Sequence, residues 1–375
     1  MTVPDDDRPS SAGKKARKSR VRKSGEQPVV DPDLATTLRF EKTAPAAVVS
    51  GAAPDRVAGF FGQASVAPSV QEERSSSVPG ERPSRPAAQQ RLGAVVAKRW
   101  KLVRLLGHGA AGAVFEGVDK DTGERVAVKV LHDRHARSKE QVSRLMREAR
   151  AVRAIDHPGV VEVLDAGRDK EGHVYIAFEL LEGEDLRSRM DRGDLTTAQM
   201  VEIGRQLLQV LSAAHKKHVL HRDVKPENIF LVRSPDATIR LKLLDFGIAK
   251  LTEGKSSVDT LDGVTLGTPY YMSPEQCRGE KLSAQADVWS VGAVLFHVFA
   301  GRPPFEDERL GRLLERIVTE RPMSLEDLCP DLPPRLVSAV DRALEPSSLD
   351  RWPSAQTMAA ALATYLLPLP SLDIE

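Results

Sequence analysis

Hydrophobic and polar positions repeat with two different periods, and the change divides the chain into a strand-rich part and a helix-rich part. Valine-rich alternating runs predict strands at 101–106, 113–118, 124–131, 160–163 and 174–180. Between them, residues 139–154 carry apolar side chains at helical spacing. Beyond Gly183 the pattern predicts helices at 197–217, 284–300, 309–320, 333–344 and 354–366. This order indicates an α+β fold with two lobes in one continuous domain.

The first 98 residues lack this periodicity and are dominated by Ser, Pro, Ala, Arg and Lys. Such a composition is typical of a disordered tail, because it cannot bury enough apolar surface to offset its ordering entropy. We therefore expect a tail at 1–98, a folded domain at 99–367 and a short tail at 368–375. A basic cluster at 14–23 is interpreted as a solvated segment or as a docking arm for an acidic partner or nucleic acid. The segment 34–40 could fold on binding a partner.

The net charge, the cysteines and the hydropathy indicate in which compartment the protein works and what it does not bind. The formal net charge of +1 argues against a protein that coats nucleic acid along its surface. Cys277 and Cys329 offer neither a metal-binding spacing nor a disulfide framework, which favours a reducing compartment. No stretch approaches the ~20 apolar residues of a membrane helix, and the acidic N-terminus lacks the pattern of a secretory signal. We expect a cytoplasmic protein without a transmembrane segment.

A run of three glycines, Gly107, Gly109 and Gly112, is followed by Val114 in a G-x-G-x-x-G-x-V pattern. Glycines allow a backbone to approach phosphate groups closely. A dinucleotide site would place a helix after such a run, and a simple hairpin would need no ligand. Here a second strand follows, which favours a hairpin that covers a bound ligand.

A single lysine, Lys129, lies in the predicted apolar strand 124–131. A lone lysine in a strand is usually an edge charge. However, Glu148 lies on the next predicted helix, and a Lys129–Glu148 pair could hold the ammonium group against nucleotide phosphates.

The segment from His221 to Asn228 contains several reactive groups between two apolar runs. Asp223 could accept a proton from a hydroxyl group, and Lys225 could neutralise a transferring phosphoryl group. Asn228 could supply an oxygen ligand to a metal ion. Asp245 ends another apolar strand, where a carboxylate suits Mg²⁺.

In this order and at these separations, the motifs resemble those of the eukaryotic-like (Hanks-type) serine/threonine protein kinases, and we expect a bacterial member. The resemblance continues through Gly267–Glu275, Asp287–Gly292 and Arg351, and it covers roughly residues 100–366. It implies a bilobal protein kinase fold, with a small β-rich N-terminal lobe and a larger helical C-terminal lobe. It also implies ATP and Mg²⁺ as cofactors, with Mn²⁺ as a substitute, and proteins with Ser or Thr acceptors as substrates.

The resemblance assigns catalytic and nucleotide-binding roles. Asp223 would be the catalytic base beside Lys225, and Asn228 with Asp245 would hold the metal ion. Phe178 would be the gatekeeper, and Glu179 and Leu181 would offer backbone groups to adenine. The full set expected to bind ATP is Leu106, Gly107, Gly109, Gly112, Val114, Ala127, Lys129, Glu148, Phe178, Glu179 and Leu181.

The resemblance also assigns structural and regulatory roles. Glu275 and Arg351 would form an ion pair, and Asp287 would brace the catalytic loop, His221–Asn228. Arg222 would bind a phosphate on the activation loop, the segment between Asp245 and Glu275. Thr260 and Thr265 are expected to carry that phosphate as autophosphorylation sites. Thr268 is expected to face the substrate, and together with Lys225 it indicates Ser/Thr specificity.

Three alternatives to an active protein kinase are open from the residues. A pseudokinase scaffold would bind partners without transferring phosphate, but Lys129, Asp223, Asn228 and Asp245 are all present. A protein that acts through its basic tail would bind an acidic partner or, less favoured by the net charge, nucleic acid. A small-molecule phosphotransferase is disfavoured by the peptide-binding segment at 267–275.

Overall fold

The computed structural model describes residues 38–39, 88–109, 112–132, 139–233, 238–246 and 269–366. All of them belong to one compact unit, Ala35–Glu375. The basic cluster at 14–23 and the segment 367–375 lie outside the described residues. Among the described helices, none combines the length and the apolar character needed to span a bilayer.

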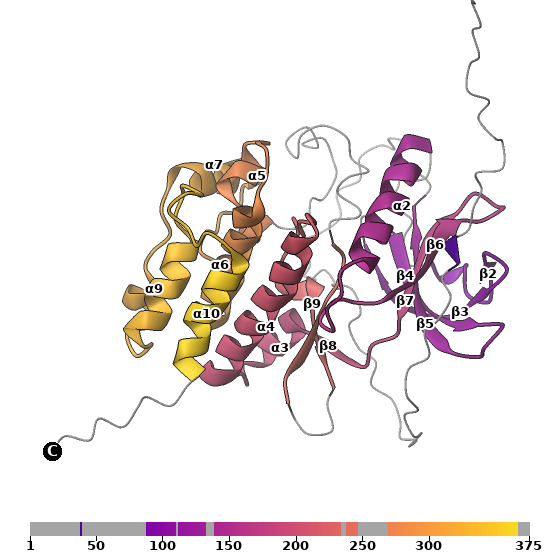
Figure 1. The fold of residues 1–375 in the computed structure, drawn as a ribbon, viewed down its shortest axis with the longest axis horizontal. Coiled ribbons are helices and arrows are strands. Elements are labelled where there is room, and N and C mark those ends of the chain that lie inside the picture. The colour runs from indigo at the N-terminus through magenta and orange to yellow at the C-terminus, as the bar shows by residue number, and fades with distance from the viewer. Residues whose placement is uncertain are drawn as a thin grey trace, which may run out of the picture. The chain divides into compact units, whose positions relative to one another are not determined.

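A seven-stranded antiparallel sheet forms the N-terminal lobe (Figure 1), in the order β1-β6-β7-β5-β4-β3-β2. Its strands are β1 (Leu38–Arg39), β2 (Val95–Val96), β3 (Trp100–His108), β4 (Gly112–Asp119), β5 (Arg125–Leu131), β6 (Val163–Arg168) and β7 (Val174–Glu179). Helix α2 (Lys139–Arg153) lies beside β6. Trp100, Phe115 and Tyr175 are buried together in a core on the sheet. Strand β5 is buried on both of its faces, since six of its seven residues are buried.

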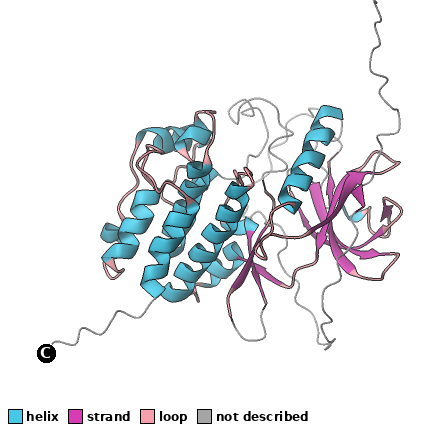
Figure 2. Ribbon diagram, in the orientation of Figure 1, coloured by secondary structure: helices cyan, strands magenta, loops and turns pink. Residues whose placement is uncertain are grey.

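The C-terminal lobe is mainly helical (Figure 2). Its elements are β8 (Gly183–Asp185), α3 (Leu186–Arg192), α4 (Thr197–Lys216), η2 (Pro226–Asn228), β9 (Ile229–Val232), β10 (Arg240–Leu243), η4 (Pro269–Tyr271), α5 (Pro274–Cys277), α6 (Ala284–Ala300), α7 (Leu310–Thr319), α8 (Leu325–Leu328), α9 (Pro334–Ala343) and α10 (Ala355–Leu366). The strands form a small sheet in the order β10-β9-β8.

Helix α4 packs against both α6 and α10 at the centre of this lobe. It begins where Thr196 caps the amide of Gln199, while the Gln199 side chain caps the amide of Thr196 in return. Helix α6 is apolar on nearly every face, and buried Trp289 stacks on Phe305 with ring centroids 6.4 Å apart. Such an all-round apolar helix is expected only inside a core.

The structure confirms the α+β class, the two lobes and the five long C-terminal helices, whose ends differ from the predicted ends by a residue or so. It differs at the predicted strand 160–163. Strand β6 begins only at Val163, because Val160 pairs instead with Leu243 of β10 in an isolated parallel bridge.

The described fold also begins before the predicted boundary at residue 99. Ala88 and Val96 are buried in the same core as Trp100, and β2 pairs antiparallel with β3. Two residues are too few to show a strand period, so the sequence pattern gave no sign of β2.

Candidate active site

The glycine-rich hairpin joins β3 to β4, as expected. The amide of Gly109 donates to Gly112 O at 2.9 Å, which closes the turn. A Cβ on Gly112 would collide with Val130 O and would lie 2.9 Å from Leu131 Cα, both in the backbone of β5. Gly109, in contrast, has no atom within 4 Å of the position of a Cβ. The close approach of β5 therefore explains Gly112, whereas space alone does not require Gly109.

Lys129 stands on β5 directly opposite Val114 of β4. Its side chain is 10% exposed, and Nζ lies 2.7 Å from both carboxylate oxygens of Asp245. A lysine of the first lobe and an aspartate of the second thus form one charged pair. The Lys129–Glu148 pair remains a prediction; Glu148 itself lies on α2 and is partly buried.

The apolar residues expected around adenine lie on strands of the first lobe or just after them. Ala127 of β5 pairs with Phe178 of β7, and both are buried. Val114 and Leu181 are also buried, and Leu106 packs on the same core. The next residue after Phe178 is Glu179, which ends β7. Gly107, whose backbone pairs with Val114, belongs to β3.

His221 anchors the start of the catalytic loop. It is fully buried, and burial lowers the pKa of its imidazole, which is therefore neutral. Its Nδ1 accepts a hydrogen bond from the amide of Asp223 at 3.2 Å, so the proton resides on Nε2 and is donated to Leu244 O at 2.8 Å. This one ring therefore ties the catalytic loop to the segment that leads to Asp245.

Asp223, Lys225 and Asn228 meet within this loop. Asn228 Nδ2 donates to Asp223 O at 2.7 Å and to Asp223 Oδ2 at 3.2 Å. Lys225 Nζ lies 3.0 Å from the same Oδ2. Burial opposes the charged ammonium group, yet the Asp223 carboxylate raises the pKa of Lys225 above its ordinary value. Lys225 is therefore a permanent cation beside the predicted base.

The predicted metal ligands offer oxygen atoms that suit a hard divalent ion. The amide nitrogen of Asn228 is used by Asp223, which leaves the amide oxygen as its ligand atom. Leu244 donates its amide to Asn228 O at 2.8 Å, which brings the neighbouring Asp245 to this loop. A carboxylate and an amide oxygen are the donors that Mg²⁺ prefers, so the residues fit the ion.

Asp287, on helix α6, binds the start of the catalytic loop through hydrogen bonds. It is 1% exposed and accepts hydrogen bonds from the amides of His221 and Arg222 and from Nε2 of His215. Burial raises the pKa of a carboxyl group, but the hydrogen bonds from the His215 side chain and from the Arg222 amide hold the pKa of Asp287 below its ordinary value. A buried ionised carboxylate thus braces the loop at two successive amides, which sequence reasoning had anticipated only in outline.

Glu275 and Arg351 form a bidentate ion pair, with Nη1–Oε1 at 2.7 Å and Nη2–Oε2 at 2.9 Å. The guanidinium group also lies over the ring of Trp289, 4.8 Å from its centroid. This pair joins α5 to the segment between α9 and α10.

The remaining sequence candidates are the residues expected to be regulatory or to face the substrate. Arg222 has a positive φ of 64°, and its Nε is buried without a hydrogen-bond partner among the described residues. Thr260, Thr265 and Thr268 lie outside the described residues, so their roles stay predictions.

A hydrogen-bonded cluster in the C-terminal lobe was missed from the sequence. Tyr271 Oη lies 2.7 Å from Nδ1 of His297, and Nε2 of that ring lies 3.5 Å from Nη1 of Arg187. Burial, followed by the charge of Arg187, lowers the pKa of His297 to about 4. His297 lies in an apolar helical run, where nothing in the sequence distinguishes it from a core residue.

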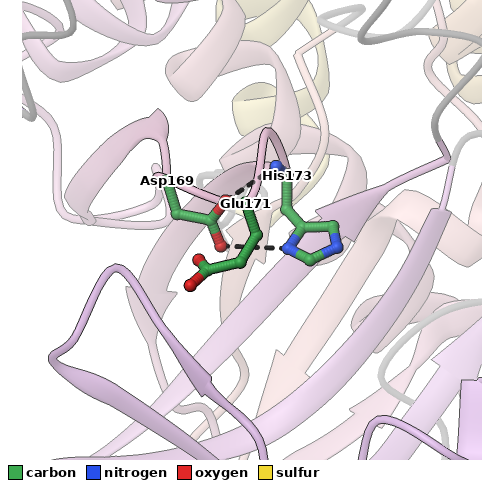
Figure 3. A group of neighbouring side chains, drawn as sticks. All are labelled: Asp169, Glu171 and His173. Carbon is green, nitrogen blue, oxygen red and sulfur yellow. Dashed lines mark hydrogen bonds and ion pairs between the residues drawn. The ribbon is translucent and has the colours of Figure 1, made fainter.

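A separate group of potential metal ligands lies at the turn between β6 and β7 (Figure 3). Asp169 accepts the amide of His173 at 2.7 Å and contacts Nδ1 of the same ring at 3.0 Å, with Glu171 beside them. The group borders a cavity of about 450 Å³ that Val95 and Leu102 also line. Because Asp169 is bonded within its own turn, the group is explained as a support of that turn. None of the predicted catalytic residues lines this cavity.

Two lobes, a glycine-rich hairpin, and the residues predicted as the ATP-binding lysine, the base and the metal ligands are together typical of a protein kinase domain. Comparison with known proteins agrees. Residues 100–359 match the sequence model of the protein kinase domain family, and the chain belongs to this family.

Bacterial serine/threonine-protein kinases are among its relatives. The chain is 38% identical over 270 residues to serine/threonine-protein kinase pkn2 of Myxococcus xanthus, a match that covers 71% of this chain and 32% of the relative. It is 34% identical over 290 residues to serine/threonine-protein kinase PknA of Mycobacterium tuberculosis, covering 75% and 65%. The matches thus span from about a third to about two thirds of these relatives' length.

The crystal structure of the Mycobacterium tuberculosis PknI kinase domain has a similar fold. It superposes with a TM-score of 0.58 at 28% sequence identity, and the match covers 73% of this chain and 98% of that structure.

Proposed function

We propose that this chain is a serine/threonine protein kinase, which transfers the γ-phosphoryl group of ATP to hydroxyl groups of protein Ser and Thr side chains. The observation that carries the proposal is the assembly of Asp223, Lys225 and Asn228 within hydrogen-bond distance. Family membership and the relatives named above support the same activity.

Asp223 would accept the proton of the attacking hydroxyl group. Asn228 orients this carboxylate through Oδ2, and we assign Oδ1 to the acceptor hydroxyl group. Lys225, bonded to the same Oδ2, would neutralise charge on the transferring phosphoryl group. Because its charge is stabilised by Asp223, Lys225 would retain it across the physiological pH range.

ATP and a divalent cation are the cofactors that family membership implies. Asn228 and Asp245 would hold that cation, for which we propose Mg²⁺, with Mn²⁺ as a weaker substitute. The bound cation would neutralise negative charge between the β- and γ-phosphates. Lys129 would contact the α/β-phosphates, and in the free enzyme its charge is satisfied by Asp245.

Activation is proposed to follow autophosphorylation at Thr260 or Thr265. Arg222 supports this idea, because the buried Nε has no hydrogen-bond partner among the described residues and is available to an anion. A cytoplasmic location, where ATP is supplied, is part of the proposal and agrees with the two cysteines, Cys277 and Cys329, neither of which forms a disulfide.

The test is ³²P transfer from labelled ATP to proteins of a heat-treated lysate of the source organism, with phosphosite mapping of substrates and enzyme. We expect phosphoserine and phosphothreonine, modification of Thr260 or Thr265, and a loss of roughly 10²–10⁴-fold for Asp223→Ala. The matched control is Asp327→Ala, which removes an exposed aspartate on α8. Equal activity of Asp223→Ala and the wild type would refute the base assignment. A wild type without activity would favour the pseudokinase scaffold.

A further inference from the structure

A lysine outside the predicted site joins three segments of the two lobes. Lys242, on β10, donates from Nζ to Glu179 Oε1 at 2.5 Å and to Val160 O at 3.2 Å. The same Glu179 oxygen accepts the amide of Glu162 at 2.7 Å. One ammonium group and one carboxylate therefore connect the end of β7, the loop before β6 and the small sheet of the second lobe.

Backbone hydrogen bonds hold the same loop against both neighbours. Leu243 donates to Gly159 O at 2.7 Å and accepts from the amide of Val161 at 3.3 Å. On its other side, the amide of Glu179 donates to Glu162 O at 3.1 Å. The segment 159–162 is thus a spacer between β7 and β10. Lys242 is the side chain that spans this spacer.

The two ends of this connection coincide with two parts of the proposed nucleotide site. Glu179 is the residue whose backbone we expect beside adenine. Lys242 is followed by Leu243 and Leu244, and then by Asp245, the proposed metal ligand. The amide of Leu244 is hydrogen-bonded to Asn228 O, which restricts the short segment between Lys242 and Asp245. A movement of Lys242 would therefore also move Asp245. A contact that fixes Glu179 relative to Lys242 would also fix the proposed adenine-contacting segment relative to the proposed metal ligand.

The exposure of the pair indicates what it can contribute. The side chains of Lys242 and Glu179 are 21% and 26% exposed, so solvent screens their attraction. Such a pair contributes little to the free energy of unfolding, but a geometrical constraint between two binding groups needs only a preferred position.

We propose that Lys242 is a positioning residue, which by bonding Glu179 and Val160 sets Asp245 relative to the adenine-contacting segment. Nucleotide and metal binding are coupled through this contact. The inference rests on the proposed function, because it assumes that adenine and the metal bind at these two places.

The experiment measures ADP affinity of the full chain by titration calorimetry, in EDTA and in excess Mg²⁺. Its readout is the factor by which Mg²⁺ tightens ADP binding. For Lys242→Met we expect ADP affinity in EDTA within about twofold of the wild type, and a Mg²⁺ factor reduced by about fivefold or more. Glu179→Ala should reduce the factor similarly, and the losses of the two single variants should not add up in the double variant, because both break the Lys242–Glu179 contact.

Lys242→Arg keeps the positive charge and should keep most of the Mg²⁺ factor. If Lys242→Met does not fold, Lys242→Arg is the variant of this position that is measured instead. Arg316→Met, which breaks the exposed Arg316–Glu320 pair on α7, is the matched control and should leave the factor unchanged. A wild-type Mg²⁺ factor in Lys242→Met would overturn the inference, as would an equal loss of affinity in EDTA and in Mg²⁺. A wild type that binds no ADP would instead refute the proposed function.

Discussion

Replacing Arg351 by methionine should strongly destabilise the domain, because it leaves the Glu275 carboxylate in a buried site without its partner. Arg351 is fully buried, and its guanidinium group makes five hydrogen bonds: two to Glu275 and one each to the carbonyl oxygens of Gln285, Glu345 and Pro346. Methionine has a similar length but can make none of them. Breaking a buried ion pair in this way typically costs about 3–5 kcal/mol.

The assay is urea unfolding followed by tryptophan fluorescence, since Trp289 lies beneath the guanidinium group. With a slope of about 3 kcal/mol per molar urea for a domain of this size, the midpoint should fall by roughly 1–1.7 M. The matched control is again Arg316→Met, whose partner Glu320 stays in solvent, and its expected loss is below about 0.5 kcal/mol.

The pH dependence provides a second check. In the wild type, burial raises the pKa of Glu275, but the hydrogen bonds from Arg351 outweigh it and hold that pKa below its ordinary value. Without Arg351, burial dominates and the folded-state pKa rises above the unfolded one. At low pH, protonation of Glu275 then removes the buried charge and stabilises the folded variant. This stabilisation is lost as the pH rises. The difference between variant and wild type should therefore be smaller at pH 5 than at pH 8.

The double variant Glu275→Gln/Arg351→Met should recover part of the loss, since no charge is left stranded. The reasoning is wrong if Arg351→Met unfolds within 1 kcal/mol of the control, taking about 3 kcal/mol as the smallest loss expected for a buried pair. It is also wrong if the loss of stability is the same at pH 5 and pH 8.

Two further predictions concern the glycine-rich hairpin and the histidine cluster. Gly112→Ala should destabilise the domain by about 1–3 kcal/mol and weaken ATP binding, because its Cβ would collide with backbone of β5; Gly109→Ala, with open space, should leave the stability unchanged. Equal stability of the two variants by urea unfolding would contradict this account. For His297, whose folded-state pKa is about 4 against 6.5 in the unfolded chain, only the unfolded state gains a proton between those values. Stability should therefore fall by up to about 3 kcal/mol as the pH falls through that window. His297→Asn should flatten this part of the urea-stability profile; an unchanged profile would exclude the histidine as its source.

The sequence predicted elements well where a period is long enough to count. Helices α4 and α10 repeat an apolar face over several turns, and their predicted ends agree closely with the structure. The sequence pattern did not predict β2 and α8, because these elements are too short to show a repeating apolar pattern. It also misplaced the strand at 160–163, since an apolar run says nothing of its partner, and Val160 turns out to pair with β10.

For the site, spacing identified side chains whose chemistry is distinctive, but not the contacts that position them. Lys242 was overlooked because a lysine that alternates with leucines looks like an ordinary exposed position of a strand. Its role depends on Glu179, 63 residues away in the sequence. Likewise, the motif pointed to Asp287, but only the fold shows that it accepts two successive amides and a histidine.

Backbone strain explains why the loop needs these supports. Arg222 and Asp245 have φ values of 64° and 46°, a left-handed conformation that costs a residue other than glycine about 1–3 kcal/mol. Glycine at either position would remove that strain, but it would also remove the guanidinium group or the carboxylate of the proposed metal ligand. Instead, Asp287 binds the Arg222 amide and His221 binds the carbonyl of the residue before Asp245. Two buried side chains, those of His221 and Asp287, thus hold two strained backbone positions. The catalytic loop is consequently the part of the domain where loss of a supporting hydrogen bond should reduce activity before it unfolds the protein.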